Sequence, residues 1–400
     1  MEKTKNIIIL IDVYSNNGGA SKVAMTYARK LREYGYNTFF VCNNVLHGEK
    51  CPNEVVVMNS VQNLVQFFRK NVIVAIHYFK AKQLLKERSI FGKVIEALYH
   101  VDVTPKILIT VCQQPSYSRA ILTPYEIKHS DMLIFIDKTA YNDPIYNFIP
   151  KDRKCWMYLL ASKEMLQNAE EDKFVKKNYV SDESTIVFGR GSTLNKCPKD
   201  VITLYDKIRS SQDKRFVIVG VPEEQNWLTN IIAKREGHDI ITYPLLPIKE
   251  YAEIVGSFDI MLYYIPKSSY SSIDGSLRMA FRLGVPVVLY GSPAIQESVI
   301  HGSTAFIAKN KEEFVYYAEL LANDASLREK IGRNARKHYF DDAPDEYWVV
   351  KHKNIMEKVL KEVNNNSIHI PLIVSVKIYF IKNVSWALEA LSKVIIKFCR

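Results

Sequence analysis

The sequence lacks the cysteine and histidine patterns that mark metal centres and disulfide frameworks. Its six cysteines form no Cys-x-x-Cys pair, and its nine histidines neither cluster nor form a His-Glu-x-x-His motif. The cysteines are scattered at Cys42, Cys51, Cys112, Cys155, Cys197 and Cys399. This spacing predicts no metal site and predicts free thiols in a reducing compartment. Since no secretory signal is recognisable at the start, we expect a cytoplasmic location.

Two common phosphate-binding signatures are also missing. No Gly-x-x-x-x-Gly-Lys-[Ser/Thr] motif occurs, which argues against a P-loop enzyme. The first predicted strand is followed by NNGGAS instead of Gly-x-Gly-x-x-Gly, and the second ends at Cys42-Asn43-Asn44, where an NAD site would have an acid. An NAD-dependent enzyme is therefore disfavoured.

Apolar runs and helical periodicity are abundant. Hydrophobic residues make up 48% of the 400 positions, enough for two or three ordinary domains. Strand-like runs of β-branched residues alternate with helical segments from residue 6 onward, and a second such series begins at residue 185. The alternation predicts an α/β fold with two Rossmann-like, doubly wound parallel-sheet domains.

The domain limits follow from where this alternation breaks. The charge-rich segment 168–183 has few core residues and suggests domains over 1–167 and 168–343. Pro344 precedes a long helical pattern, so a separate helix is expected over 344–365. The remaining residues, 366–400, form a basic tail with amphipathic helical spacing, interrupted too often by charge to span a bilayer.

The net charge of +11 is concentrated in two places. Seven basic residues and one acid lie between Arg69 and Lys93, and five basic residues and one acid lie in the tail after residue 366. Such patches favour an anionic membrane or nucleic acid, although solvated helix faces would look the same. Since no nucleic-acid recognition motif is present, we do not expect nucleic acid as a partner. The tail could equally be a helix packed on the domains.

Ligands bind at the carboxyl ends of the strands in open parallel sheets, which directs attention to the loops there. Gly18 and Gly19 follow the first strand and open a helix, so their backbone could approach a ligand, or they form only a tight turn. Asp274, Gly275 and Ser276 stand where a helix begins within SSIDGSLRMAFRLGVPVV, as a phosphate site or an ordinary N-cap.

Charged residues follow other strands of both series. Arg190 and Lys196 are expected in a loop between strand and helix, beside Gly189. Two cations in such a loop suit a diphosphate, unless they are solvent-facing loop charges. His77 ends a strong strand, where it is either a catalytic or a structural residue. Two sets of strand ends from two domains imply a ligand cleft between them.

Several of these stretches together resemble the group 1 (family 4-like) glycosyltransferases of the two-domain GT-B fold. The resemblance covers about Asn6 to Leu360, and its second half is the more specific. The motifs in the family's order are Gly18-Gly19-Ala20, Val187-Phe188-Gly189-Arg190 with Lys196, Phe216-Val217-Ile218-Val219-Gly220, and Gly284-Val285-Pro286-Val287-Val288 with Glu297.

The resemblance implies transfer of a sugar from a nucleotide-diphosphate donor, held mainly by the second domain, to an acceptor on the first. Arg190 and Lys196 would neutralise the diphosphate without a metal or other cofactor. The other donor-binding positions implied are Gly18, Gly19, Gly189, Tyr243, Leu245, Asp274, Gly275 and Ser276. The helix over 344–365 would cross back to the first domain. The expected acceptor is a surface glycan or a lipid-linked precursor, reached at the inner face of the membrane through Arg69–Lys93 and 371–400.

The chain departs from the family at three positions. Two acids that commonly precede the Gly-Val-Pro turn fall at Ser271 and Met279, and a histidine of the first domain falls at Cys112 or Gln113. The second acid typically holds the ribose, a role that either Asp274 takes over or no residue fills. Retention of configuration, usual in the family, is therefore an open question. The alternative is a catalytically silent GT-B subunit that acts as a binding or chaperone partner.

Overall fold

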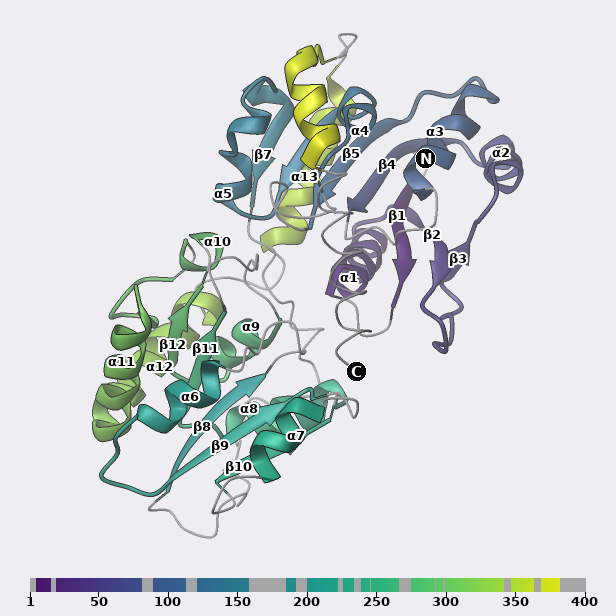
Figure 1. Cartoon of the computed structure of the whole chain (residues 1–400). Helices are drawn as coiled ribbons and strands as arrows, with labels where there is room; N and C mark the ends of the chain where they lie inside the picture. Colours follow the sequence, from purple (N-terminus) through teal and green to yellow (C-terminus); the bar gives the residue numbers. More distant parts are fainter. Residues whose placement is uncertain are drawn as a thin grey trace. The chain divides into compact units, whose positions relative to one another are not determined.

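The computed structural model divides the chain into two units, Met1–Leu159 with Tyr347–Arg400 and Leu160–Glu346. Figure 1 shows a parallel sheet with covering helices in each. The residues described are 5–15, 19–80, 89–112, 121–157, 185–191, 200–221, 226–233, 239–244, 246–265, 275–291, 293–297, 299–341, 347–362 and 368–381.

The first unit is built on seven strands in the order β3-β2-β1-β4-β5-β6-β7. Neighbouring strands are parallel throughout. Their bounds are β1 Asn6–Tyr14, β2 Asn37–Val45, β3 Val55–Val57, β4 Ile73–Lys80, β5 Lys106–Val111, β6 Met132–Phe135 and β7 Lys154–Trp156. The strand order reverses between β1 and β4, which makes their carboxyl ends the topological switch point of this sheet.

Helices cover both faces of the first sheet. Successive side chains of β4 point to opposite faces and are apolar or aromatic on both, so each face is buried under helices. His77 and Phe79 face α1 and α13, whereas Ile76 and Tyr78 belong to the core on the other face. The helices are α1 Gly19–Glu33, α2 Val61–Lys70, α3 Ile90–Tyr99, α4 Pro124–Lys128, α5 Lys138–Tyr141 and α13 Tyr347–Lys361, with 3-10 turns at Pro144–Tyr146 and Lys151–Arg153. Residues 372–381 form a further helix.

The second unit repeats this plan with six parallel strands in the order β10-β9-β8-β11-β12-β13. The strands are β8 Ile186–Gly191, β9 Lys214–Val219, β10 Ile240–Tyr243, β11 Ile260–Tyr264, β12 Val287–Tyr290 and β13 Phe306–Ile307. The helices are α6 Asp200–Lys207, α7 Asn226–Ala233, α8 Ile248–Gly256, α9 Gly275–Arg282, α10 Pro293–Gln296, α11 Lys311–Asn323 and α12 Ala325–Arg336, followed by a π-helical turn Lys337–Asp341. Here the switch point lies between β8 and β11.

The Gly-Val-Pro turn between α9 and β12 is explained by packing. Gly284 has φ +70°, a left-handed conformation that favours glycine. A Cβ on Gly332 of α12 would lie 1.9 Å from the Gly284 carbonyl oxygen, so both positions need a hydrogen side chain. The motif therefore fixes the approach of α12 to the turn.

The predicted fold class is confirmed, with two Rossmann-like parallel sheets and helices near the C-terminus. One helix of the first unit, α2, was not predicted. The expected domain limits at 167 and 343 lie outside the described residues, as does the tail beyond residue 381.

Candidate functional site

Arg190 lies at the carboxyl end of β8, beside the topological switch point of the second sheet. Arg190 was expected in the loop after this strand, but pairing of β8 with β9 continues through Arg190–Ile218 and Gly191–Val219, so Arg190 belongs to the strand. The side chain is 0% exposed. The sequence placed the guanidinium at the correct edge of the sheet, but the structure buries it.

The surroundings of Arg190 leave most of its hydrogen-bonding capacity unused. Its Nη1 donates to the Leu262 carbonyl oxygen at 3.0 Å, and its Cζ lies 5.3 Å from the centre of the Tyr263 ring. Within the described residues, Nε and Nη2 have no hydrogen-bond partner. A buried donor without a partner costs about 1–3 kcal/mol, so the geometry favours an anionic ligand at this place.

Gly189 precedes Arg190 for a reason unrelated to a ligand. A Cβ at this position would lie 2.0 to 2.2 Å from ring atoms of Phe258. Because Phe258 fills the space that a side chain would need, the glycine is required by the core of the second unit. Its assignment as a donor-binding residue therefore has no support in the geometry.

The other donor-site candidates lie at neighbouring element ends. Gly275 is the exposed first residue of α9, and Ser276 is buried behind it. Tyr243 ends β10, and its carbonyl oxygen accepts from the Gly220 and Val221 amides at 3.0 Å each. Lys196, Leu245 and Asp274 lie outside the described residues, so their roles stay predictions.

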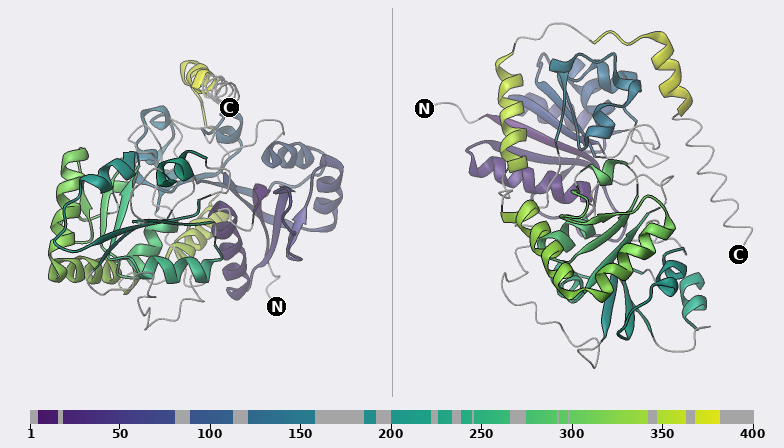
Figure 2. Two further views of the ribbon diagram at one scale, coloured as in Figure 1. Left: turned by 60° about the horizontal axis from the view of Figure 1, so that its bottom comes forward. Right: turned by 90° about the vertical axis from the view of Figure 1, so that its left-hand side faces the viewer.

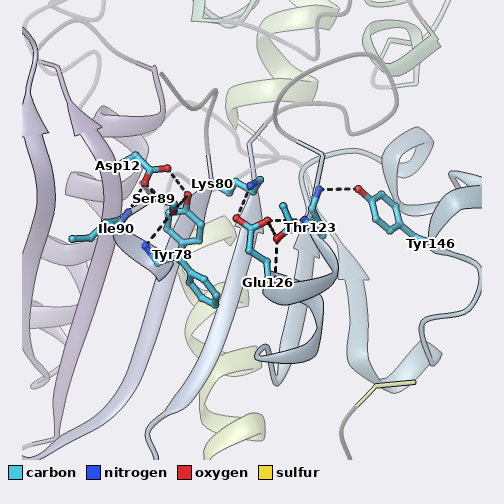
Figure 3. Close-up of polar contacts among 10 residues, drawn as sticks. Asp12, Tyr78, Lys80, Ser89, Ile90, Thr123, Glu126 and Tyr146 are labelled. Atoms are coloured by element: carbon cyan, nitrogen blue, oxygen red, sulfur yellow. Dashed lines mark hydrogen bonds and ion pairs between the residues drawn. The ribbon is translucent and has the colours of Figure 1, made fainter. Parts of the chain in front are cut away.

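At the carboxyl edge of the first sheet, Gly19 begins α1 and is exposed, while Gly18 lies outside the described residues. Asp12 of β1 binds the start of α3, as Figure 3 shows. Its carboxylate accepts from Ser89 Oγ at 3.0 Å, from the Ile90 amide at 2.9 Å and from the Tyr78 hydroxyl. Burial and the Asp12 charge raise the pKa of Tyr78 well above its usual value. Asp12 thus joins β1, β4 and α3.

A buried ion pair stands at the same edge (Figure 3). Lys80 Nζ lies 2.5 Å from Glu126 Oε1, and both side chains are almost fully buried. The second Glu126 oxygen accepts from the Thr123 amide at 2.7 Å in the capping box of α4. Removing one partner of such a pair costs about 3–5 kcal/mol, because the other charge stays buried.

This pair bears on the basic segment Arg69–Lys93, which was expected to favour an anionic membrane or to form solvated helix faces. Lys80 is neutralised inside the first unit. Lys93 is also held internally, since its Nζ donates to Asn43 Oδ1 at 2.6 Å and to the Asn59 carbonyl oxygen at 2.7 Å. At least two of the seven basic residues are therefore committed to contacts within the fold.

His77 is a core residue that helps to attach α13 to the first sheet. Its Nε2 lies 2.7 Å from Thr110 Oγ1, which lies 3.3 Å from His352 Nε2 on α13. The His77 ring stacks on Phe79 at 4.5 Å and is 0% exposed. Burial, with a smaller contribution from His352, lowers the pKa of His77 well below its usual value. A neutral, enclosed imidazole of this kind gives no support to a catalytic role.

Of the four residues at positions where the chain departs from the family motifs, the structure describes two. Met279 is buried in the core of the second unit, among the side chains beneath α9. Cys112 follows β5 and its Sγ lies 3.8 Å from the Thr110 carbonyl oxygen. Ser271 and Gln113 lie outside the described residues. No group of three or more His, Cys, Asp or Glu among the residues described could hold a metal ion, so metal independence stays a prediction.

Comparison with known proteins identifies the second unit. Residues 168–338 match the family described as glycosyl transferases group 1. The second unit contains a domain of this group, and the chain is a glycosyltransferase. Its fold is the GT-B fold of the solved structures described next.

The glycosyltransferase resembles several solved structures over most of its length. A glycosyltransferase from Rickettsia africae is 14% identical, with 90% of this chain and 100% of that chain covered and a TM-score of 0.66. HepE from Anabaena, solved with UDP and glucose, is 12% identical, with coverages of 88% and 100% and a TM-score of 0.64. WaaG, a glycosyltransferase involved in lipopolysaccharide biosynthesis, is 15% identical, with coverages of 90% and 100% and a TM-score of 0.60. No curated protein matches this chain by sequence.

Sequence reasoning missed the polar clusters of the first unit. Asp12 is hidden in an apolar strand, and nothing in the local pattern indicates its partners. Glu126, in contrast, had a signal: Thr123-Pro-Tyr-Glu126 is a capping-box pattern, which the structure forms in full. That pattern would have predicted the start of a helix at Thr123, although neither the burial of Glu126 nor its pairing with Lys80.

Proposed function

We propose that this glycosyltransferase moves a sugar from a nucleotide-diphosphate sugar to a glycan or lipid-linked acceptor during synthesis of a surface polysaccharide or glycoconjugate. Two relatives support the donor and the pathway class. HepE structures contain UDP-glucose or UDP and glucose, and WaaG acts in lipopolysaccharide biosynthesis.

The observation that carries the proposal is the buried, largely unpartnered guanidinium of Arg190 at the switch point of the group 1 domain. A diphosphate accepts two parallel hydrogen bonds from such a fork and neutralises its charge. Lys196, six residues further along, supplies the second cation in this proposal. Under this proposal the two side chains neutralise the diphosphate, so no residue has to act as a metal ligand.

The same group assists the chemical step. The bond between the anomeric carbon and the diphosphate oxygen breaks, and an acceptor hydroxyl oxygen forms the new bond and loses its proton. Negative charge grows on the departing diphosphate, where a preorganised guanidinium stabilises the transition state more than the ground state. We propose retention of configuration, as is usual for this group, and catalysis without a metal.

A catalytically silent subunit is the second candidate, and Met279 favours it. The side chain at the position of the family's second acid is buried in the core of the second unit, so no carboxylate is available there. Such a subunit would bind the donor without transferring the sugar. In both cases the protein acts at the cytoplasmic face of the membrane, where lipid-linked acceptors are assembled.

A donor screen with product analysis separates these outcomes. Nucleotides and nucleotide sugars with uracil, guanine and adenine bases are tested by thermal shift. A ligand at 100 times its dissociation constant stabilises the native state by about 2.7 kcal/mol. The enzyme is expected to show both a shift and release of the nucleoside diphosphate with candidate acceptors. A shift without turnover would identify the silent subunit, and no shift with any nucleotide would refute the proposal.

A further inference from the structure

The helix 372–381 is held on the first unit by one of its faces. Ile378 is 1% exposed and belongs to the hydrophobic core of the first unit, and Val374 and Ile381 pack against the same core. These residues are spaced by four and three positions, so they form one stripe along the helix. Figure 2 shows this helix, in yellow, on the other side of the first sheet from α13. The stripe therefore fixes which way the helix faces.

The opposite side of this helix is apolar and open to solvent. We define it as the outer face: Leu372, Ile373, Val376, Tyr379 and Phe380. At 100° per residue these five positions lie within a sector of about 120°, centred opposite the buried stripe. Their exposed fractions range from 58% to 80%. Five of the 14 exposed large apolar side chains in the described residues thus stand on ten consecutive positions.

An apolar surface of this kind needs a partner, because soluble proteins rarely expose contiguous apolar patches that have no function. The charge around it indicates which one. Residues 367–400 contain Lys377, Lys382, Lys393, Lys397 and Arg400 against the single acid Glu389. A cationic segment with an aromatic and aliphatic face is complementary to an anionic lipid surface, where apolar side chains enter the acyl boundary and lysines contact headgroups.

We propose that the outer face of helix 372–381 inserts into the surface of an anionic membrane, with the helix lying in the plane of the interface. Ten residues extend only about 15 Å, half of a hydrocarbon core. None of the helices in the described ranges is long and apolar enough to cross a bilayer. Tyr379 and Phe380 are the interfacial anchors, and Lys377 stands at the edge of the apolar sector.

This inference deepens the proposed function, since it rests on a membrane-bound acceptor for its biological purpose, but its geometry is independent of catalysis. It also assigns membrane contact to a different surface from the segment Arg69–Lys93, in which Lys80 and Lys93 are committed to internal contacts. The apolar outer face, rather than that basic segment, determines whether the protein binds lipid.

The test is cosedimentation of the full-length protein with sucrose-loaded vesicles of phosphatidylcholine containing 30% phosphatidylglycerol. Val376→Glu with Phe380→Glu should weaken binding by roughly tenfold or more, because charges replace inserting side chains. Val72→Glu is the matched control, since Val72 is 76% exposed on the same unit, between α2 and β4. Its binding should equal that of the wild type. Lys377→Glu should weaken binding to these vesicles more than to pure phosphatidylcholine.

Other outcomes would overturn the inference. If the double variant binds vesicles like the wild type, the outer face does not insert. If the wild type binds no vesicles and is a dimer that the double variant converts to a monomer, a second copy covers the face. If vesicle binding appears only after deletion of residues 382–400, that segment covers it. Unchanged unfolding temperatures and donor-induced thermal shifts of the variants separate loss of lipid binding from loss of folding or of the proposed function.

Discussion

Replacing Arg190 by methionine should make the ligand-free protein more stable and the enzyme much less active. Methionine has a similar length and no charge, so it fills the same buried volume. In the native protein two guanidinium nitrogens have no partner among the residues described, each at a cost of about 1–3 kcal/mol. The variant loses the hydrogen bond to Leu262 and the contact with Tyr263, which offset part of that gain.

The net expectation is a gain of about 2 kcal/mol, or a rise of about 4–8 °C in the unfolding temperature of a domain of 150–250 residues. Activity should change in the opposite direction. Loss of one charged group that stabilises the departing diphosphate is expected to reduce the transfer rate by about a hundred- to a thousandfold. Donor-induced thermal shifts should shrink or vanish. This opposition of stability and function is the signature of a residue kept for its ligand.

The assay combines differential scanning fluorimetry, with and without donor, and measurement of released nucleoside diphosphate. Arg333→Met is the matched control: Arg333 lies on α12 of the same unit, and its side chain is 71% exposed. It should change neither quantity. Arg190→Lys keeps the charge without the planar fork and should retain intermediate activity. If Arg190→Met lowers the unfolding temperature and leaves donor binding intact, Arg190 is a structural residue with a partner within the chain.

Two further predictions concern packing in each unit. In the first, burial lowers the pKa of His352 to about 4 and that of His77 well below its usual value. The unfolded chain binds these protons near pH 6.5, so stability should fall as pH falls from about 6.5 towards 4. Urea denaturation should show that the free energy of unfolding falls by about 1–1.5 kcal/mol per histidine between about pH 7.5 and 5.5. The variant His352→Gln should show a smaller fall. Equal free energies of unfolding at the two pH values would contradict the neutral, buried state of these histidines. In the second unit, Gly189→Ala should destabilise by about 1–3 kcal/mol through collision with Phe258, without changing the donor dissociation constant. Gly275→Ala, where a Cβ meets nothing within 4 Å, should stay within about 0.5 kcal/mol of the wild type, and equal effects of the two substitutions would refute the packing argument.

The fold was predictable because hydrophobic periodicity depends on local sequence. The runs that form β1, β4, β8 and β11 consist of buried residues on both faces, as strands inside a parallel sheet require. The short strand β7 and the helix α2 were not predicted. β7 has only three residues, and too few positions repeat to identify a period.

The candidate site was predicted only in outline. The edge of the sheet was correct for Arg190, because a cation after an apolar run must lie near the strand end. The expected loop position of Arg190 was wrong, since strand pairing with β9 continues three residues beyond the apolar run, through Gly191. Lys80 shows the same limit. From the sequence alone a lysine is expected at the surface, and only the ion pair with Glu126, 46 residues away, explains why this lysine is buried.

By itself, the sequence determined the class of this protein. The alternation of strands and helices, the order of the glycine-containing motifs and the placement of Arg190 near a strand end are local properties, and they were sufficient for the group 1 glycosyltransferase fold. Burial depends on segments far apart in the chain and was decided only by the tertiary structure. The structure enclosed Arg190 without a described anionic partner, removed His77 from solvent under α13, neutralised Lys80, and left the outer face of helix 372–381 exposed. The energy of a charged or apolar side chain depends on what surrounds it, and packing supplies those surroundings.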